Sequence, residues 1–345
     1  MKRFAARSCF VLLVGLFGIS LCIAQSPISG YHLLKKFEVG GEGGWDYLFA
    51  DSAAHRVYVS RSTRVIVLDS ETGAAIGEIP NTNGVHGIAI AEDLGRGFTS
   101  NGRDNAVTIF DLKTLKPLGT VATGKNPDAI IYDAASKRVF AFNGGSSNAT
   151  AIDAADGKVA GTIDLGGKPE FATSDGKGMV FVNIEDKSLV VAIDSHKLTV
   201  TNRWALAPGE EPSGMAIDAK HHRLFSVCSN KKEIVLDYDT GKVVADVPIG
   251  NGPDAAGFDP DTKLAFSSNG EGTLTVIKED GPNKFSVVEN ITTQRGARTM
   301  TFDQKTHKIY LAAAQYGETP AATAQNPRPR PKMIPNSFVI LVFGK

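Results

Sequence analysis

Seven polar side chains occupy the same position in successive repeats of the sequence, five residues before the end of the first expected strand of each repeat. Together they are called the mouth ring here: Asp46, His86, Asp128, Glu170, Ser213, Asp254 and Arg298. If the repeats close around a channel, these side chains meet at its mouth. Carboxylates that converge on a narrow channel repel one another, and a bound cation relieves that repulsion. The sequence therefore predicts a candidate metal site with the ligands Asp46, His86, Asp128, Glu170 and Asp254.

The donor types limit what this site would take. Carboxylate oxygens favour Ca²⁺, Mg²⁺ or Mn²⁺ over Zn²⁺, although His86 permits a transition metal. The guanidinium of Arg298 can hold a carboxylate or phosphate bidentately, and Trp45, next to Asp46, offers a stacking surface. The sequence thus predicts a ligand site at the mouth made of Trp45, Asp46, His86, Ser213 and Arg298.

A purely structural explanation of the mouth ring stays open. The strand-end position five residues later also carries carboxylates in most repeats, and turn chemistry is a sufficient cause there. Duplication of a repeat therefore places acidic residues in rings without any ligand. By the same argument Arg298 neutralises its neighbours and Trp45 is a packing residue. The sequence has no CxxC or HExxH motif, and its spacing assembles no serine, histidine and acid set.

The repeats are defined by a residue, usually basic, that is followed by a short β run. These runs begin, at spacings of 40, 42, 41, 44, 40 and 45 residues, at Arg56, Arg96, Arg138, Met179, Arg223, Lys263 and Lys308. Another apolar strand ends in an aspartate in five repeats, at Asp69, Asp111, Asp153, Asp194 and Asp237. Four alternating strands fit each unit, as in a propeller blade. We therefore predict an all-β, seven-bladed β-propeller with four-stranded blades.

The two ends of the chain predict how the propeller closes. The seventh repeat reaches only its third strand, at 338–343, whereas residues 31–39 form an extra strand before the first repeat. We expect the N-terminal strand to be the outer strand of the last blade, which removes an open seam. A proline-rich insertion at 314–336 interrupts the last blade on the mouth face. It is either a lid or docking strip for an acidic partner, or a surface loop without a role.

These repeats resemble those of the YVTN-type seven-bladed β-propellers, which are named for a strand like Val57-Tyr58-Val59-Ser60. The resemblance is carried by residues 56–60, 65–69 and 240–244, covers the chain from residue 25 onward, and is greatest to the secreted, YncE-like bacterial branch. It departs at Met179, which replaces the basic residue, and at Lys278, which replaces the strand-end aspartate. The resemblance implies an envelope location and a seven-bladed fold, and it fixes no activity.

Residues 1–24 have the pattern of a secretory signal peptide, with a basic start, an apolar stretch from Phe10 to Ile23 and a small residue at Ala24. The remaining residues, 25–345, are expected to be one propeller domain in the periplasm or outside the cell. The 37 basic and 37 acidic residues cancel, so nucleic acid is not an expected partner. The apolar stretch is too short for a membrane span, so we do not expect this protein to be an integral membrane protein. We also expect it to be a monomer.

Cys228, which lies outside the predicted signal peptide, and most histidines are expected to have no chemical role. Cys228 lies in a strand-like run and is predicted to be a half-buried structural thiol. Four histidines adjoin the residues that begin the second strands and are predicted to be solvated turn residues on the face opposite the mouth: His55, His221, His222 and His307.

Two functional hypotheses follow. The first is a binding or scaffold protein that recognises a small-molecule ligand or an envelope protein at the channel mouth. The second is a metal-dependent, lactonase-like hydrolase in which a ring-bound cation activates water and Asp128, Glu170 or His86 is the base.

Overall fold

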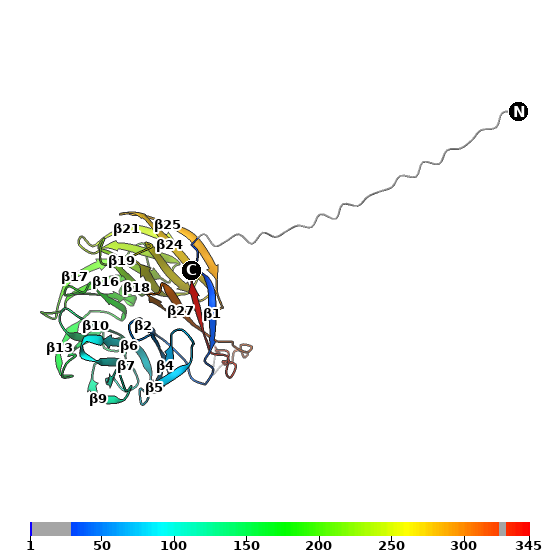
Figure 1. Cartoon of the computed structure of the whole chain (residues 1–345). Helices are drawn as coiled ribbons and strands as arrows, with labels where there is room; N and C mark the ends of the chain where they lie inside the picture. The colour runs from blue at the N-terminus through cyan, green and yellow to red at the C-terminus, as the bar shows by residue number, and fades with distance from the viewer. Residues whose placement is uncertain (2–28, 324–328) are drawn as a thin grey trace.

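Seven four-stranded sheets surround a central channel in the computed structural model, which describes residues 1, 29–323 and 329–345 (Figure 1). Neighbouring strands pair antiparallel within every sheet. The described residues form no α-helix and only two short 3₁₀ turns, at Glu92–Leu94 and Glu185–Lys187. This arrangement confirms the predicted seven-bladed β-propeller. The predicted signal peptide at 1–24 lies outside the described residues except for Met1, and so do residues 324–328 of the proline-rich insertion.

In blades 1 to 6 the strands follow the chain order and the first strand is the innermost, whereas blade 7 has β26 innermost and β1 outermost. Blade 1 contains β2 (Leu48–Asp51), β3 (Arg56–Arg61), β4 (Arg64–Asp69) and β5 (Ala75–Ile79). Blade 2 contains β6 (Val85–Ala91), β7 (Arg96–Asn101), β8 (Ala106–Asp111) and β9 (Pro117–Ala122). Blade 3 contains β10 (Pro127–Asp133), β11 (Arg138–Asn143), β12 (Asn148–Asp153) and β13 (Val159–Asp164). Blade 4 contains β14 (Pro169–Ser174), β15 (Met179–Ile184), β16 (Leu189–Asp194) and β17 (Thr199–Ala205). Blade 5 contains β18 (Pro212–Asp218), β19 (Arg223–Cys228), β20 (Lys232–Asp237) and β21 (Lys242–Pro248). Blade 6 contains β22 (Pro253–Asp259), β23 (Leu264–Asn269), β24 (Thr273–Gly281) and β25 (Lys284–Thr292). Blade 7 contains β26 (Met300–Asp303), β27 (Lys308–Ala313), β28 (Val339–Gly344) and β1 (His32–Glu38).

The hydrophobic core is divided among the contacts between blades. Each of the seven interfaces between neighbouring blades holds one apolar cluster. Second and third strands are sandwiched between two blades, which explains near-continuous apolar runs such as residues 139–142 in β11. Outer strands such as β9 leave their residues exposed. Cys228 is fully buried rather than half-buried as predicted, because the second strand of blade 5 is covered on both faces.

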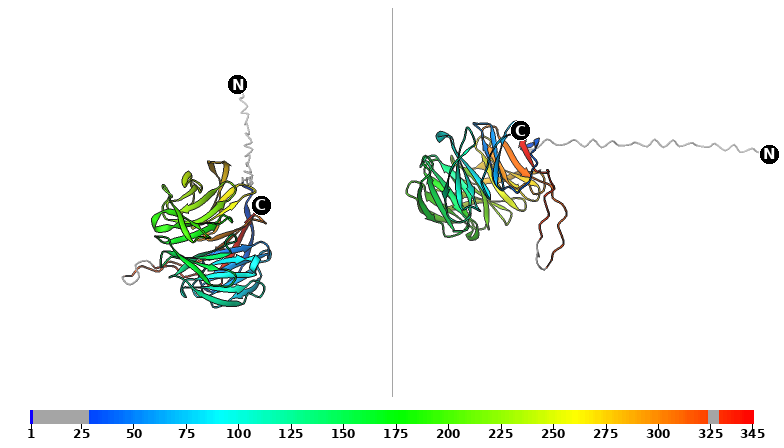
Figure 2. Two further views of the ribbon diagram at one scale, coloured as in Figure 1. Left: turned by 90° about the vertical axis from the view of Figure 1, so that its left-hand side faces the viewer. Right: turned by 90° about the horizontal axis from the view of Figure 1, so that it is seen from below.

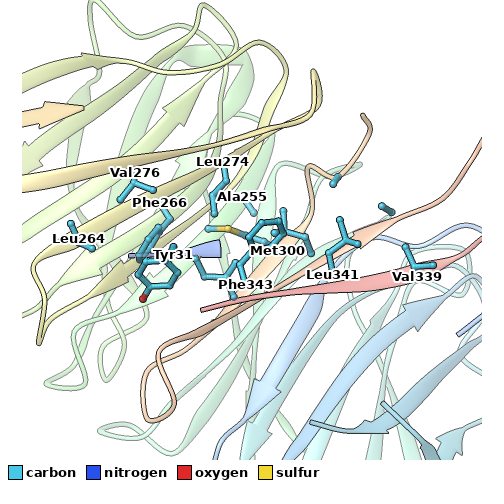
Figure 3. Close-up of a cluster of buried hydrophobic side chains, with 14 residues drawn as sticks. Tyr31, Ala255, Leu264, Phe266, Leu274, Val276, Met300, Val339, Leu341 and Phe343 are labelled. Atoms are coloured by element: carbon cyan, nitrogen blue, oxygen red, sulfur yellow. The ribbon is translucent and has the colours of Figure 1, made fainter. Parts of the chain in front are cut away.

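The N-terminal strand closes the propeller as predicted. β1 pairs with β28, so blade 7 has the order β1-β28-β27-β26. Figure 3 shows the apolar cluster beside this seam, where the ring of Tyr31 lies 5.0 Å from that of Phe266 and near Met300 and Phe343. The first and last strands of the chain therefore form one blade and leave no unpaired strand between them.

The two faces of the propeller differ in their loops. Hairpins between first and second strands form the hairpin face. There, buried strand-end aspartates accept hydrogen bonds from backbone N–H groups of their own turns, at Asp51, Asp133, Asp218, Asp259 and Asp303. Turn chemistry therefore explains the strand-end aspartates, as the sequence suggested.

The proline-rich insertion leaves the opposite, mouth face. Its two described arms are bridged at Tyr316 and Met333, and they project away from the blades (Figure 2). Met333 packs into the same apolar cluster as Trp45, which immediately precedes the mouth residue Asp46. The base of the insertion thus lies beside the mouth ring on blades 7 and 1.

Candidate functional site

Serine hydroxyls at equivalent places in the second strands hold the loops of the mouth ring. Ser60 accepts a hydrogen bond from the backbone N–H of Asp46 at 2.9 Å, and Ser100 accepts one from Gly87 at 2.9 Å. The hydroxyl of Ser100 also donates to the carbonyl of Asp128 in the next blade. These bonds tie the backbone near Asp46, His86 and Asp128 to the second strands of blades 1 and 2, so these three side chains are positioned by strands.

The mouth ring surrounds a cavity of about 450 Å³. Six of its seven members line that cavity, namely Asp46, Asp128, Glu170, Ser213, Asp254 and Arg298. His86 lies behind Asp46 and Asp128 and contacts both carboxylates. The predicted convergence of these residues from different blades is therefore correct.

In one three-residue cluster of the ring, side-chain atoms that could bind a metal lie close together. Nδ1 of His86 lies 2.6 Å from Oδ2 of Asp46 and 3.6 Å from Oδ1 of Asp128. One ligand atom from each of the three residues lies within 4.8 Å of the others. We call this set the mouth cluster.

The other two predicted metal ligands pair with basic or hydroxyl groups instead. Nζ of Lys168 lies 2.6 Å from Oε1 of Glu170. Asp254 accepts a hydrogen bond of 3.1 Å from the hydroxyl of Thr299 and lies 3.6 Å from Arg298. The geometry therefore separates Glu170 and Asp254 from the mouth cluster, although both line the same cavity. Arg298 does neutralise a carboxylate, as the structural explanation expected.

Trp45 does not line the mouth cavity. Its ring packs 4.9 Å from that of Phe338 within the cluster between blades 7 and 1. This packing agrees with the structural alternative for Trp45, and its role as a ligand-stacking surface stays a prediction. Ser213 does line the cavity, and its hydroxyl donates to the carbonyl of Pro253 at 3.4 Å.

Burial and crowding disturb the acidity of the mouth carboxyls. Burial raises the pKa of Asp128 to about 6, against the opposing effect of His86 and with a further increase from Asp46. Burial, followed by the charge of Asp128, raises the pKa of Glu170 to about 7. Burial also raises the pKa of Asp254. Although burial lowers the pKa of His86, its hydrogen bond to Asp46 and the charge of Asp128 outweigh that effect and raise it. The surroundings of the mouth therefore oppose the ionisation of Asp128, Glu170 and Asp254, and a nearby cation would favour it.

An aromatic pair that the sequence did not reveal forms the floor of the mouth cavity. The rings of Tyr47 and Phe171, from blades 1 and 4, lie 5.4 Å apart. Both also line a second cavity of about 430 Å³ further along the channel, where most neighbours are apolar. The available signal was positional. The residue that follows each mouth-ring position is small in five blades and aromatic only at Tyr47 and Phe171.

Further charged residues at the mouth come from outside the repeated position. Glu185 and Glu211 line the cavity, and Lys168 bonds both Glu170 and Glu185. Glu185 lies in a 3₁₀ turn between the second and third strands of blade 4, a loop that reaches the same face. Counting back from strand ends cannot find residues in such loops.

Comparison with known proteins establishes the fold alone. No protein-family model matches the chain, and no curated protein matches its sequence. Among solved structures, 1771 chains match. One of them is described as "Structure of U3-55K"; it has 10% sequence identity and a TM-score of 0.73, and the match covers 90% of this chain and 98% of that one. None of the described residues forms a helix with the length and hydropathy of a membrane span. The chain is therefore similar to this solved protein in its fold.

Proposed function

We propose that this protein is a binding propeller of the periplasm or the extracellular space whose mouth cavity takes a divalent cation and, beside it, a small molecule. The observation that carries the proposal is the mouth cluster, in which two carboxylates from different blades flank one imidazole. A divalent ion would satisfy both carboxylates together and offset the burial that opposes the ionisation of Asp128. Asp46, His86 and Asp128 would be its protein ligands.

The donor set favours particular ions. Two carboxylate oxygens and one imidazole nitrogen suit Mn²⁺ or Zn²⁺ better than Ca²⁺, which takes six to eight oxygen ligands. The sequence, with four carboxylates and one histidine as ligands, favoured Ca²⁺, Mg²⁺ or Mn²⁺ over Zn²⁺. With only two carboxylates beside the histidine, Zn²⁺ becomes as suitable as Mn²⁺. The remaining cavity, with Arg298 and the Tyr47–Phe171 floor, has room for a small polar molecule at the open coordination positions of the ion.

The proposed location rests on the N-terminal sequence pattern. The proposed YncE-like kinship rests on the repeats. A basic start and a short apolar stretch in residues 1–24 are typical of export. After removal of this signal peptide, the exported protein would begin near Gln25. An envelope protein docking at the base of the proline-rich insertion remains compatible with this function.

A specific observation favours hydrolysis as the second candidate function. Glu170 lines the same cavity as the mouth cluster, and its pKa of about 7 suits a general base at neutral pH. In such an enzyme the cation would polarise a carbonyl while Glu170 takes a proton from water. A panel of lactones and esters, tested with Mn²⁺ or Zn²⁺ present, would show activity that Glu170→Gln abolishes.

Calorimetric titration of the chelator-treated chain from residue 25 with Mn²⁺ and Zn²⁺ tests the proposed function. We expect His86→Ala and Asp128→Asn each to weaken binding at the mouth by at least about tenfold. Asp254→Asn is the matched control, because it removes a mouth carboxylate outside the cluster. Binding that is equally insensitive to all three substitutions would contradict the proposal.

A further inference from the structure

We infer that Asp218, His221 and Glu279 form a second divalent transition-metal site, on the hairpin face between blades 5 and 6. This set is called the hairpin cluster here. Oδ2 of Asp218 lies 2.6 Å from Nδ1 of His221, and Oε2 of Glu279 lies 3.5 Å from the same nitrogen. One ligand atom from each residue lies within 4.8 Å of the others. The site is independent of the proposed function, since it shares no residue with the mouth cluster.

Blade 3 shows a different set of residues at the equivalent positions. In blade 3 the strand-end Asp133 is buried and accepts two hydroxyl hydrogen bonds on its Oδ2. Ser136, three residues later, donates at 2.6 Å, and Ser195, which follows the third strand of blade 4, donates at 2.7 Å. The carboxylate is therefore fully satisfied by neutral donors from its own hairpin and from the next blade.

The hairpin cluster occupies the same three positions with different chemistry. His221 lies three residues after Asp218, as Ser136 does after Asp133. Glu279 is the counterpart of Ser195, because each donates its backbone N–H to the hairpin carbonyl of its own blade, at 3.0 Å to Lys263 and 2.9 Å to Gly178. The replacement turns a hydroxyl donor into a second acceptor. Two carboxylates thus meet where, in blade 3, one carboxylate meets two hydroxyl donors.

Glu279 supplies an independent sign that a ligand is missing. The residue is only 5% exposed, and its Oε2, the atom nearest His221, has no hydrogen-bond partner among the described residues. A buried carboxylate oxygen without a donor is costly, and this one is directed at an imidazole already bonded to another carboxylate. A dication at this place would satisfy both acidic groups together.

The chemistry of the donors identifies the class of ion. One imidazole with two carboxylates resembles the open three-ligand sets that bind Zn²⁺ and related divalent transition metals and leave a position for water. Asp218 and Glu279 are buried, whereas the side chain of His221 is 32% exposed, so the open position faces solvent past the imidazole. The backbone N–H groups of Lys220 and His221 hold the other oxygen of Asp218 and fix its orientation.

A titration in a His86→Ala background tests this site with the mouth cluster disabled. The chelator-treated chain would be titrated with Zn²⁺ by calorimetry and with Co²⁺ by visible absorption, which reports coordination geometry. We expect one bound ion per chain. Glu279→Ser and His221→Ser, which restore the residue types of the Asp133 site, should each weaken binding by at least about tenfold. His222→Ala is the matched control and should bind as before, because His222 pairs with Asp239 outside the cluster.

Two measurements separate loss of the site from loss of the fold. Without metal, Glu279→Ser should melt at the same temperature as the His86→Ala parent or higher, because a hydroxyl donor replaces an unpartnered carboxylate. Added Zn²⁺ should raise the melting temperature of that parent and not of the variant. Absence of Zn²⁺ and Co²⁺ binding in the His86→Ala background would overturn the inference. Unchanged affinity in both serine variants would do the same. If His86→Ala changes no binding at all while the serine variants do, the mouth proposal fails and the hairpin cluster stands.

Discussion

Asp128 is the residue of the mouth cluster whose ionisation is opposed by burial. Its folded-state pKa of about 6 lies above the ordinary value for an aspartate. Between about pH 4 and pH 6 the unfolded chain has released this proton and the folded chain keeps it, so stability falls as pH rises. His86, whose pKa is also raised, adds a loss of the same sign as pH rises through it.

We therefore expect Asp128→Asn, without metal, to match the parent protein near pH 4 and to be more stable by about 2 kcal/mol at pH 7.5. Urea unfolding at a series of pH values measures this difference. Asp111→Asn should change stability in the opposite direction, because the hydroxyl and backbone N–H of Thr114 lower the pKa of Asp111, and that stabilisation is present above the ordinary pKa. Equal pH profiles for Asp128→Asn and the parent would contradict the electrostatic description of the mouth.

At the scale of elements, first strands of neighbouring blades approach so closely that side-chain size decides their spacing. A Cβ added at Gly214 in β18 would lie 2.5 Å from the carbonyl oxygen of Asp254 and 2.6 Å from the Cα of Ala255. Both atoms belong to the backbone of β22 and cannot move without shifting a mouth residue. A Cβ at Gly119 on the outer strand β9 would meet nothing within 4 Å.

The glycine pair gives a second prediction. Gly214→Ala should destabilise the protein by about 2 kcal/mol or more, because it forces blades 5 and 6 apart. Gly119→Ala should leave stability unchanged within about 0.5 kcal/mol. Chemical denaturation of the two variants provides the comparison, and similar losses in both would contradict the proposed inner packing.

The sequence predicted elements well because each blade repeats one pattern. The basic anchors at Arg56 and Lys308 do begin second strands, and Asp69 and Asp237 do end third strands. Long-range pairing of side chains was harder to predict. Tyr47 meets Phe171 across the channel, and Glu279 meets Asp218 across a blade interface, although no local pattern links either pair. His221 and His307 were predicted to be solvated, yet each bonds a buried aspartate, because the hairpin face folds these imidazoles onto the strand ends.

At the scale of the whole molecule, closure by β1 makes the two ends of the chain depend on each other. The strand buries Phe37 between blades 7 and 1, and the preceding Tyr31 is buried between blades 6 and 7. Its removal also leaves β28 with an unpaired edge.

A chain that begins at residue 40 should therefore melt at least roughly 10 °C below a chain that begins at residue 29, and it should associate. Scanning calorimetry and size-exclusion chromatography of the two chains measure these effects. Identical melting temperatures would show that β1 is not needed to close the ring.

The central claim is that a divalent ion binds where three blades bring Asp46, His86 and Asp128 together. The most direct measurement is a crystal structure of the chain from residue 25 grown with Mn²⁺, with anomalous scattering used to locate the ion. The account predicts an anomalous peak within about 2.3 Å of the imidazole nitrogen of His86 and of an oxygen from each carboxylate. A crystal with Mn²⁺ in solution and no peak between these three side chains would contradict it.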